Sequence, residues 1–101
     1  MGDSDLYGGL IRLHILYHAS RQPVFGLGII EELGRHGYKL SAGTLYPMLH
    51  SMEEVGYLRS RSHIVVGKMR RNYKITAKGR KALAAAKEKV TELFGELFED
   101  T

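Results

Sequence analysis

The sequence predicts a mainly α-helical domain that carries a small β-hairpin. Helical spacing of apolar side chains occurs near both ends of the chain and again between Ser41 and Val55, and after Gly56 the spacing changes to a two-residue alternation. A helix followed directly by a basic hairpin is the order found in a winged helix-turn-helix. The whole chain, 1–101, is predicted to form one such domain, with a dimerisation helix at about 77–99.

The first predicted helix is apolar on most of its surface. Its apolar side chains follow helical spacing on two adjoining faces, Leu6, Leu10, Leu13 and Tyr17 on one and Tyr7, Ile11, Ile15 and Leu16 on the other. In a chain this small, the simplest way to bury such a helix is between its own core and a partner subunit. The helix ends near Ser20, because Pro23 cannot continue it.

Two further helices are predicted before the hairpin. One runs from about Phe25 to His36 and stops near Gly37, with inward positions at Leu27, Ile30 and Leu33. The other begins at Ser41, a favourable N-cap, and carries an inward stripe of Leu45, Leu49, Met52 and Val55. Pro47 lies after its first turn and is expected to bend it.

The start of this third helix is suited to reading DNA. Its outward positions are predicted to be Ala42, Gly43, Thr44, Tyr46 and Met48. Small residues let the backbone approach phosphates closely, and hydroxyl groups can donate to phosphates or reach base edges. The predicted DNA contacts on this recognition helix are Ser41, Gly43, Thr44 and Tyr46.

The predicted hairpin, or wing, is strongly basic. Two alternating stretches, 57–64 and 71–76, flank a turn at Val66-Gly67-Lys68. From Arg35 to Lys81 there are eleven Lys or Arg and two acidic residues, a net charge of +9, whereas the last twenty residues are acidic overall. Double-stranded DNA is therefore the expected partner, with wing contacts from Lys68, Arg70, Arg71 and Lys74.

The last predicted helix has an apolar stripe suited to pairing with another helix. Its members step by three and four residues and are Leu83, Ala86, Val90, Leu93 and Leu97, with Phe94 and Phe98 beside them. Two heptads are too few for a free coiled coil, but they suffice for helices anchored to folded domains. These seven residues are the predicted homodimer interface.

Other classes of protein fit the sequence poorly. The chain has no Cys, no Gly-rich phosphate loop and no Gly-x-Ser-x-Gly nucleophile motif, so neither an enzyme nor a cofactor is predicted. No apolar run approaches the roughly 20 residues that span a bilayer. A cytoplasmic protein without a membrane partner is expected.

His14 and His18 have a spacing that is compatible with a metal ion, because residues four apart share a helix face. The sequence offers them no Cys and no nearby carboxylate. They are therefore interpreted as interfacial histidines, and no metal site is predicted.

Three segments together resemble the PadR family of transcriptional regulators. They are Ser41-x-Gly43-Thr44-Leu45-Tyr46-Pro47-x-Leu49, Glu53-x-x-Gly56-Tyr57-Leu58 and Arg71-x-Tyr73-x-Ile75-Thr76-x-x-Gly79. The resemblance covers nearly the whole chain and implies a short, single-domain regulator. It implies homodimerisation through the last helix and binding to an inverted-repeat operator, usually as a repressor.

The chain departs from the family pattern at two places. Phe25-Gly26-Leu27-Gly28 replaces a His-Gly-Tyr-Glu-like run, and Ser51 stands where the recognition helix often has a basic residue, so the wing is expected to supply the charge. Two alternatives stay open. One is a winged-helix module that binds proteins and not DNA; the other keeps DNA binding and adds a small aromatic effector near Tyr7, Phe94 and Phe98.

Overall fold

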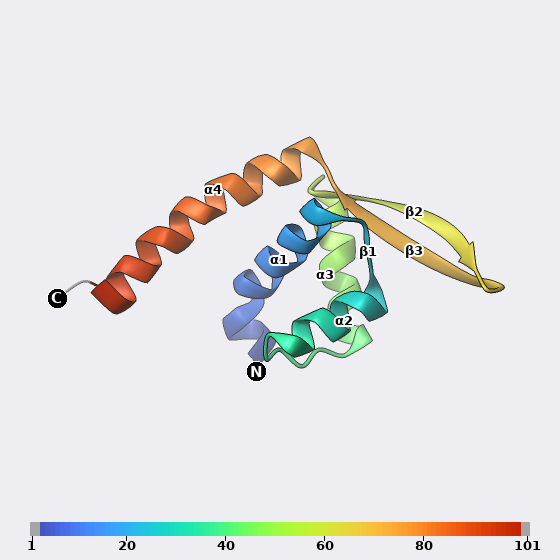
Figure 1. The fold of residues 1–101 in the computed structure, drawn as a ribbon, viewed down its shortest axis with the longest axis horizontal. Helices are drawn as coiled ribbons and strands as arrows, with labels where there is room; N and C mark the ends of the chain where they lie inside the picture. The colour runs from blue at the N-terminus through green and yellow to red at the C-terminus, as the bar shows by residue number, and fades with distance from the viewer. Residues whose placement is uncertain (1–2, 100–101) are drawn as a thin grey trace.

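The computed structural model describes residues 3–99 as a helical body with two projecting arms (Figure 1). In chain order the elements are α1 (Asp3–Arg21), β1 (Val24–Phe25), α2 (Gly26–Arg35), α3 (Ala42–Glu54), β2 (Leu58–Val65), β3 (Lys68–Ile75) and α4 (Ala77–Phe94). A π-helical turn, Gly95–Glu99, extends α4. The wing, which is the β2–β3 hairpin, and α4 project in different directions, so the molecule measures 57 × 30 × 21 Å.

The wing belongs to a three-stranded antiparallel sheet in the order β1-β3-β2. Its two long strands pair from Leu58↔Ile75 to Val65↔Lys68, which leaves Val66 and Gly67 as the turn. Both turn residues have positive φ, 50° and 75°, as a tight turn matched to strand twist requires. The short strand β1, which pairs Val24 with Tyr73, was not predicted from the sequence.

The core lies where α1, α2 and α3 meet the base of the sheet. Its largest fully buried side chains are Ile11, Ile15, Ile29, Leu33, Leu45, Leu49 and Leu58. Tyr73 of β3 is also buried and joins the sheet to the helices. At about 25 cal/mol per Å² of apolar surface, this burial is the main source of stability.

The inward face of α2 was predicted correctly at Leu33 and wrongly at Leu27. Leu27 is 64% exposed, whereas Ile29 is buried. Residues 26, 29, 30 and 33 occupy a narrower arc of a helix with 3.6 residues per turn than residues 27, 30 and 33 do. This face could not be recognised from the spacing of apolar side chains, because one of its buried positions, Gly26, has no side chain.

The stripe on α3 was predicted correctly except at two positions. Leu45, Leu49 and Met52 are buried, and so is Met48, which had been placed outward. Met48 lies three residues from Leu45 and so shares its face. Val55 is 46% exposed because the helix ends at Glu54. Pro47 lies inside the helix, as expected.

Thr76 and Gly79 fix the angle at which α4 leaves the sheet. The Thr76 hydroxyl oxygen caps α4 by accepting from the Gly79 backbone N–H at 3.0 Å, and the same hydroxyl donates to the Gly56 carbonyl. A Cβ atom at position 79 would overlap the Tyr57 carbonyl oxygen. Glycine is therefore required where α4 crosses the segment between α3 and the wing.

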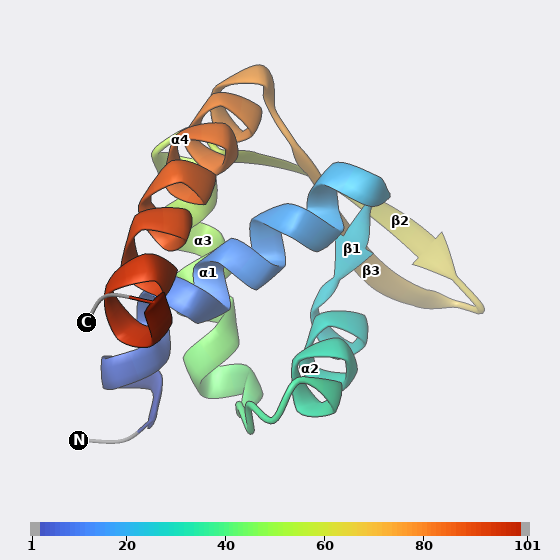
Figure 2. The same cartoon turned by 60° about the vertical axis from the view of Figure 1, so that its left-hand side comes forward.

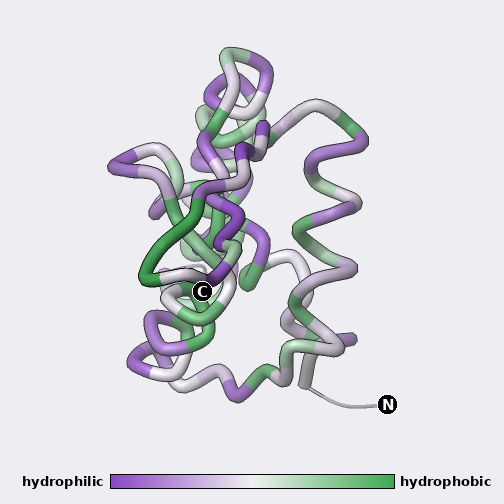
Figure 3. Tube along the Cα trace, turned by 90° about the vertical axis from the view of Figure 1, so that its right-hand side faces the viewer, coloured by the Kyte–Doolittle hydropathy of each residue, from purple (hydrophilic) through white to green (hydrophobic). Residues whose placement is uncertain are grey.

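Hydrophobic and hydrophilic stretches alternate along the whole described chain (Figure 3). Among residues 3–99, no helix combines the length and the apolar character that a membrane span needs.

Candidate nucleic-acid interface

The start of α3 and the wing flank a common groove of about 410 Å³. Four of the predicted DNA contacts, Tyr46, Lys68, Arg70 and Arg71, line it together with Phe25 and Gly26 at the start of α2. The groove thus joins one recognition-helix side chain to three cations of the wing. Such a surface presents a concentrated positive field to a polyanion.

Tyr46 is held in this groove by α2. Its ring packs against Gly26, where an added Cβ would overlap the phenolic oxygen, and the side chain remains 44% exposed. The Tyr46 side chain is thus partly covered by α2 and partly open to the groove. Gly26, which had no assigned role in the sequence, supplies the space that the ring needs.

Two wing arginines are held by neighbouring side chains. The Arg70 guanidinium stacks on the Phe25 ring, with Cζ 3.9 Å from the ring centroid. Arg71 donates from a guanidinium N–H to the Ser60 hydroxyl oxygen at 3.1 Å. Stacking and hydrogen bonding restrict both side chains before any ligand arrives, which lowers the entropy that binding would cost.

The recognition helix is also fastened to the wing. Glu53 of α3 accepts hydrogen bonds from the Ser60 hydroxyl and the Ser60 backbone N–H, at 2.6 and 2.9 Å. The hydrogen bond from the Ser60 hydroxyl is the largest cause that lowers the pKa of Glu53 below its usual 4.5, and the positive charge of Arg71 adds to it. This carboxylate is therefore ionised at neutral pH.

The remaining predicted contacts on α3 lie at its first turn. Ser41 and Gly43 are exposed and Thr44 is half-buried. The Ser41 hydroxyl oxygen accepts from the Thr44 backbone N–H at 3.2 Å, which confirms Ser41 as the N-cap. Backbone N–H groups in the first turn of a helix are not all paired within the helix, and such groups are suited to an anion.

Lys74 is not brought together with the other predicted wing contacts. Lys74 faces the same side of β3 as Lys68 and Arg70 but lies further along the strand, where it pairs with Arg59. It lines a different groove, of about 690 Å³, with Arg59, Arg61 and His63. Arg59 and Arg61 were counted in the basic segment and His63 was not, and none of the three was singled out, although their alternation with small serines placed them on one face.

The predicted dimer stripe divides into two parts along α4. Leu83 packs against the protein's own core and Ala86 is half-buried. The other five members are exposed by 43 to 72% and are Val90, Leu93, Phe94, Leu97 and Phe98. Figure 2 shows α4 passing α1. Side chains of these two helices line a groove of about 590 Å³ that is mostly apolar.

Aromatic residues in the α1–α4 groove differ from those predicted for an effector. Tyr17 lines the groove, whereas Tyr7 packs edge-on against Tyr38 with ring centroids 5.9 Å apart. Phe94 and Phe98 pack on each other, 5.0 Å apart, near the end of α4. The three aromatics named from the sequence therefore do not all line this groove.

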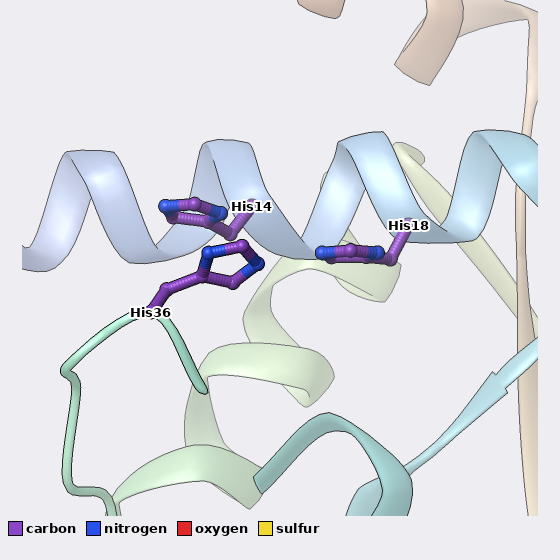
Figure 4. Close-up of side chains that lie close together, drawn as sticks. All are labelled: His14, His18 and His36. Carbon is purple, nitrogen blue, oxygen red and sulfur yellow. The ribbon is translucent and has the colours of Figure 1, made fainter. Parts of the chain in front are cut away.

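Three histidines converge beside the same groove (Figure 4). His14 and His18 lie one turn apart on α1, and His36, at the end of α2, brings a third imidazole to them. Burial is the main cause that lowers the pKa of His14 from its usual 6.5, and His36 and His18 add to it. Sequence spacing could not reveal that His36 and Glu32 come from α2 to meet this pair.

The family of the chain follows from comparison with known proteins. Residues 15–85 match the model of the transcriptional regulator PadR-like family. The chain belongs to that family. Across 87 residues it is 46% identical to transcriptional regulator Rv3488 of Mycobacterium tuberculosis, covering 86% of this chain and 81% of that relative.

Solved PadR structures share the architecture of this PadR-like chain. A PadR family regulator from Eggerthella lenta is 27% identical, with a TM-score of 0.80 over 96% of this chain and 88% of its own. A PadR-like regulator from Bacillus cereus is also 27% identical, with a TM-score of 0.80 over 97% of this chain and 100% of its own. The winged-helix class is thereby confirmed. These relatives are transcriptional regulators and not enzymes, in agreement with the sequence analysis.

Proposed function

We propose that this PadR-like regulator binds double-stranded DNA as a homodimer and represses transcription from an inverted-repeat operator. The groove that joins Tyr46 to Lys68, Arg70 and Arg71 is the single observation that carries the proposal. Wing cations would contact phosphates, while the first turn of α3 would approach base edges in the major groove. PadR-like regulators as a family bind DNA, which supports the same assignment.

The fixed geometry between α3 and the wing supports binding to DNA rather than binding to a protein partner. The Glu53–Ser60 hydrogen bonds and the Phe25–Arg70 stacking hold the cations where both elements can contact one duplex. Lys68 and Arg71 are exposed in the groove. Binding to a neutral protein would not require four cations on the wing, at Lys68, Arg70, Arg71 and Lys74.

Exposed apolar surface on two helices supports the homodimer. Five members of the α4 stripe are exposed, and on α1 Leu6, Leu10 and Tyr17 are exposed by 77, 43 and 46%. Complete burial of a fully exposed apolar side chain gains about 1.5 to 3 kcal/mol, and each of these side chains would gain the part of it that corresponds to its exposed fraction. A second copy of α4 laid against α1 and α4 covers both surfaces, and two-fold symmetry then presents two recognition helices to two half-sites.

The test is a mobility-shift titration with the DNA upstream of the protein's own gene, because regulators of this type commonly control their own expression. We expect a complex with two chains per site and a footprint over two inverted half-sites about one helical turn apart. Equal affinity for this DNA and for shuffled DNA would contradict operator recognition. Absence of binding to either DNA at low salt would instead favour the protein-interaction module.

A second role, relief of repression by a small aromatic molecule, rests on the α1–α4 groove. Leu10, Leu13, Leu83 and Val90 give it an apolar lining, and Tyr17 offers an aromatic face. A compound bound there would contact the helices that set the distance between half-sites. Release of operator DNA by such compounds, lost in a Leu13→Arg variant that still dimerises, would support this role; release that persists in the variant would place the compound elsewhere.

A further inference from the structure

We propose that His14, His18 and His36 form a binding site for a divalent transition-metal ion of the Zn²⁺ class (Figure 4). One nitrogen from each imidazole lies within 4.8 Å of the corresponding nitrogens of the other two. Two of the rings come from one face of α1, and the third comes from the residue that ends α2. The site is distinct from the DNA groove and does not depend on the proposed function.

The three rings need little movement to coordinate one ion. Zn–N bonds of about 2.0–2.1 Å in a tetrahedral site place ligand nitrogens roughly 3.4 Å apart. The His14 and His36 rings already stack with their centroids 4.5 Å apart, and the His18 and His36 centroids are 5.7 Å apart. Because the three ligand nitrogens already lie within 4.8 Å of one another, each pair would have to approach by no more than roughly 1.4 Å to share one ion.

Glu32 of α2 is placed to supply a fourth ligand. Its Oε2 atom lies 3.2 Å from His36 Nε2 and 3.7 Å from His18 Nε2. The His18 Nε2 atom is buried and makes no hydrogen bond, which is costly for a polar atom unless a ligand engages it. A metal ion at this point would satisfy that nitrogen and the carboxylate together.

The chemistry of the ligands selects the class of metal. Three neutral imidazoles and one carboxylate suit Zn²⁺, Co²⁺, Ni²⁺ or Cu²⁺, whereas Mg²⁺ and Ca²⁺ prefer oxygen ligands. The competing explanation is a packed aromatic cluster without metal, since the His14 ring also meets Tyr38 edge-on at 5.4 Å. Packing alone, however, leaves the buried His18 nitrogen without a hydrogen bond, since the nearest carboxylate oxygen, from Glu32, is 3.7 Å away.

A titration of the unaltered chain, prepared without a polyhistidine tag, tests the proposal directly. Zn²⁺ is added while the imidazole nitrogen resonances of all five histidines are followed by NMR. We expect one ion per chain, with shifts at His14, His18 and His36 and none at His50 or His63. Shifts confined to His50 or His63, or no binding at micromolar Zn²⁺, would overturn the site.

Substitutions then identify the ligands. His18→Gln and His36→Gln should each weaken Zn²⁺ binding at least tenfold, and Glu32→Gln by about tenfold. His50→Gln is the matched control, because His50 is an exposed histidine paired with Glu54 on another helix. Unchanged affinity in the two cluster variants, with native circular dichroism, contradicts the proposal. If those variants do not fold, the NMR titration of the unaltered chain still decides it.

Discussion

The Glu53 carboxylate accepts two hydrogen bonds from Ser60, and this contact fastens the end of the recognition helix to the base of the wing. Arg71 donates to the same Ser60 hydroxyl from the neighbouring strand. Three residues from α3, β2 and β3 thus form one polar connection, and one of them, Arg71, also lines the groove between α3 and the wing. The relative orientation of helix and wing is set within the monomer, before DNA is present.

Removal of this connection should lower stability in a pH-dependent way. Glu53→Gln is expected to cost about 1 kcal/mol at neutral pH, because the hydrogen bonds to a charged acceptor are weakened. The folded-state pKa of Glu53 is lowered, so its contribution is present above the ordinary value of 4.5 and is lost as pH falls through the folded-state value. Chemical denaturation of both proteins at a series of pH values measures the difference.

Glu54→Gln is the matched control for that experiment. Glu54 is the next residue, is exposed and pairs with His50 at 2.8 Å on the helix surface. Surface pairs of this kind contribute little, about 0.3–0.5 kcal/mol. A pH-independent difference between Glu53→Gln and the unaltered chain would contradict the proposed role of the charged carboxylate.

Gly79 is expected to be the glycine least tolerant of a methyl group. Gly79→Ala would force Cβ against the Tyr57 carbonyl oxygen, which is backbone and cannot move aside cheaply. The expected loss is about 1–3 kcal/mol, typical of overpacking. Gly95→Ala, which meets no atom within 4 Å, should leave stability unchanged or raise it. Equal melting temperatures for the two variants would show that the crossing of α4 is not constrained as described.

Residues at the start of α3 should affect discrimination between DNA sequences. Thr44→Ala and Tyr46→Phe are expected to lower operator affinity more than affinity for random DNA, because only base-edge contacts depend on sequence. Fluorescence anisotropy with both DNAs measures the ratio, and circular dichroism confirms folding. A proportional fall on both DNAs would assign these hydroxyls to phosphates or to packing against Gly26.

The exposed part of the α4 stripe should control assembly. Leu93→Asp is expected to give monomers or aggregates, because it places an unpaired charge in a buried interface. Operator binding should then fall even though the groove between α3 and the wing is unchanged. Ala85→Asp, on the opposite face of α4, is the control and should stay dimeric. A monomeric unaltered chain in sedimentation at micromolar concentration would contradict the dimer.

Local sequence rules predicted most of the fold. Ser41 as an N-cap, the turn near Gly67 and the helix from Ala77 each depend on neighbouring residues, and the structure has all three. Errors arose where tertiary contacts decide the outcome. Leu27 lines the groove between α3 and the wing and does not lie in the core, because it is the neighbouring Gly26 that packs against Tyr46.

Parts of the candidate sites could not be predicted from the sequence because they depend on residues that come together only in the folded chain. The eight predicted DNA contacts were chosen from charge and helix position, which do not reveal that Lys74 lines a different groove from Lys68, Arg70 and Arg71. His36 and Glu32 reach His14 and His18 only because α2 packs beside α1. Neither arrangement leaves a periodic signal in the chain.

The most direct test of the central claim compares two double variants that each remove two positive charges. Arg70→Ala with Arg71→Ala removes cations from the groove, while Arg12→Ala with Lys89→Ala removes them from α1 and α4. If the wing contacts phosphates, the first pair should weaken DNA binding and reduce the log–log salt slope by about one per lost contact. The second pair should leave affinity and slope nearly unchanged. Equal effects of the two pairs would contradict DNA binding through the groove between recognition helix and wing.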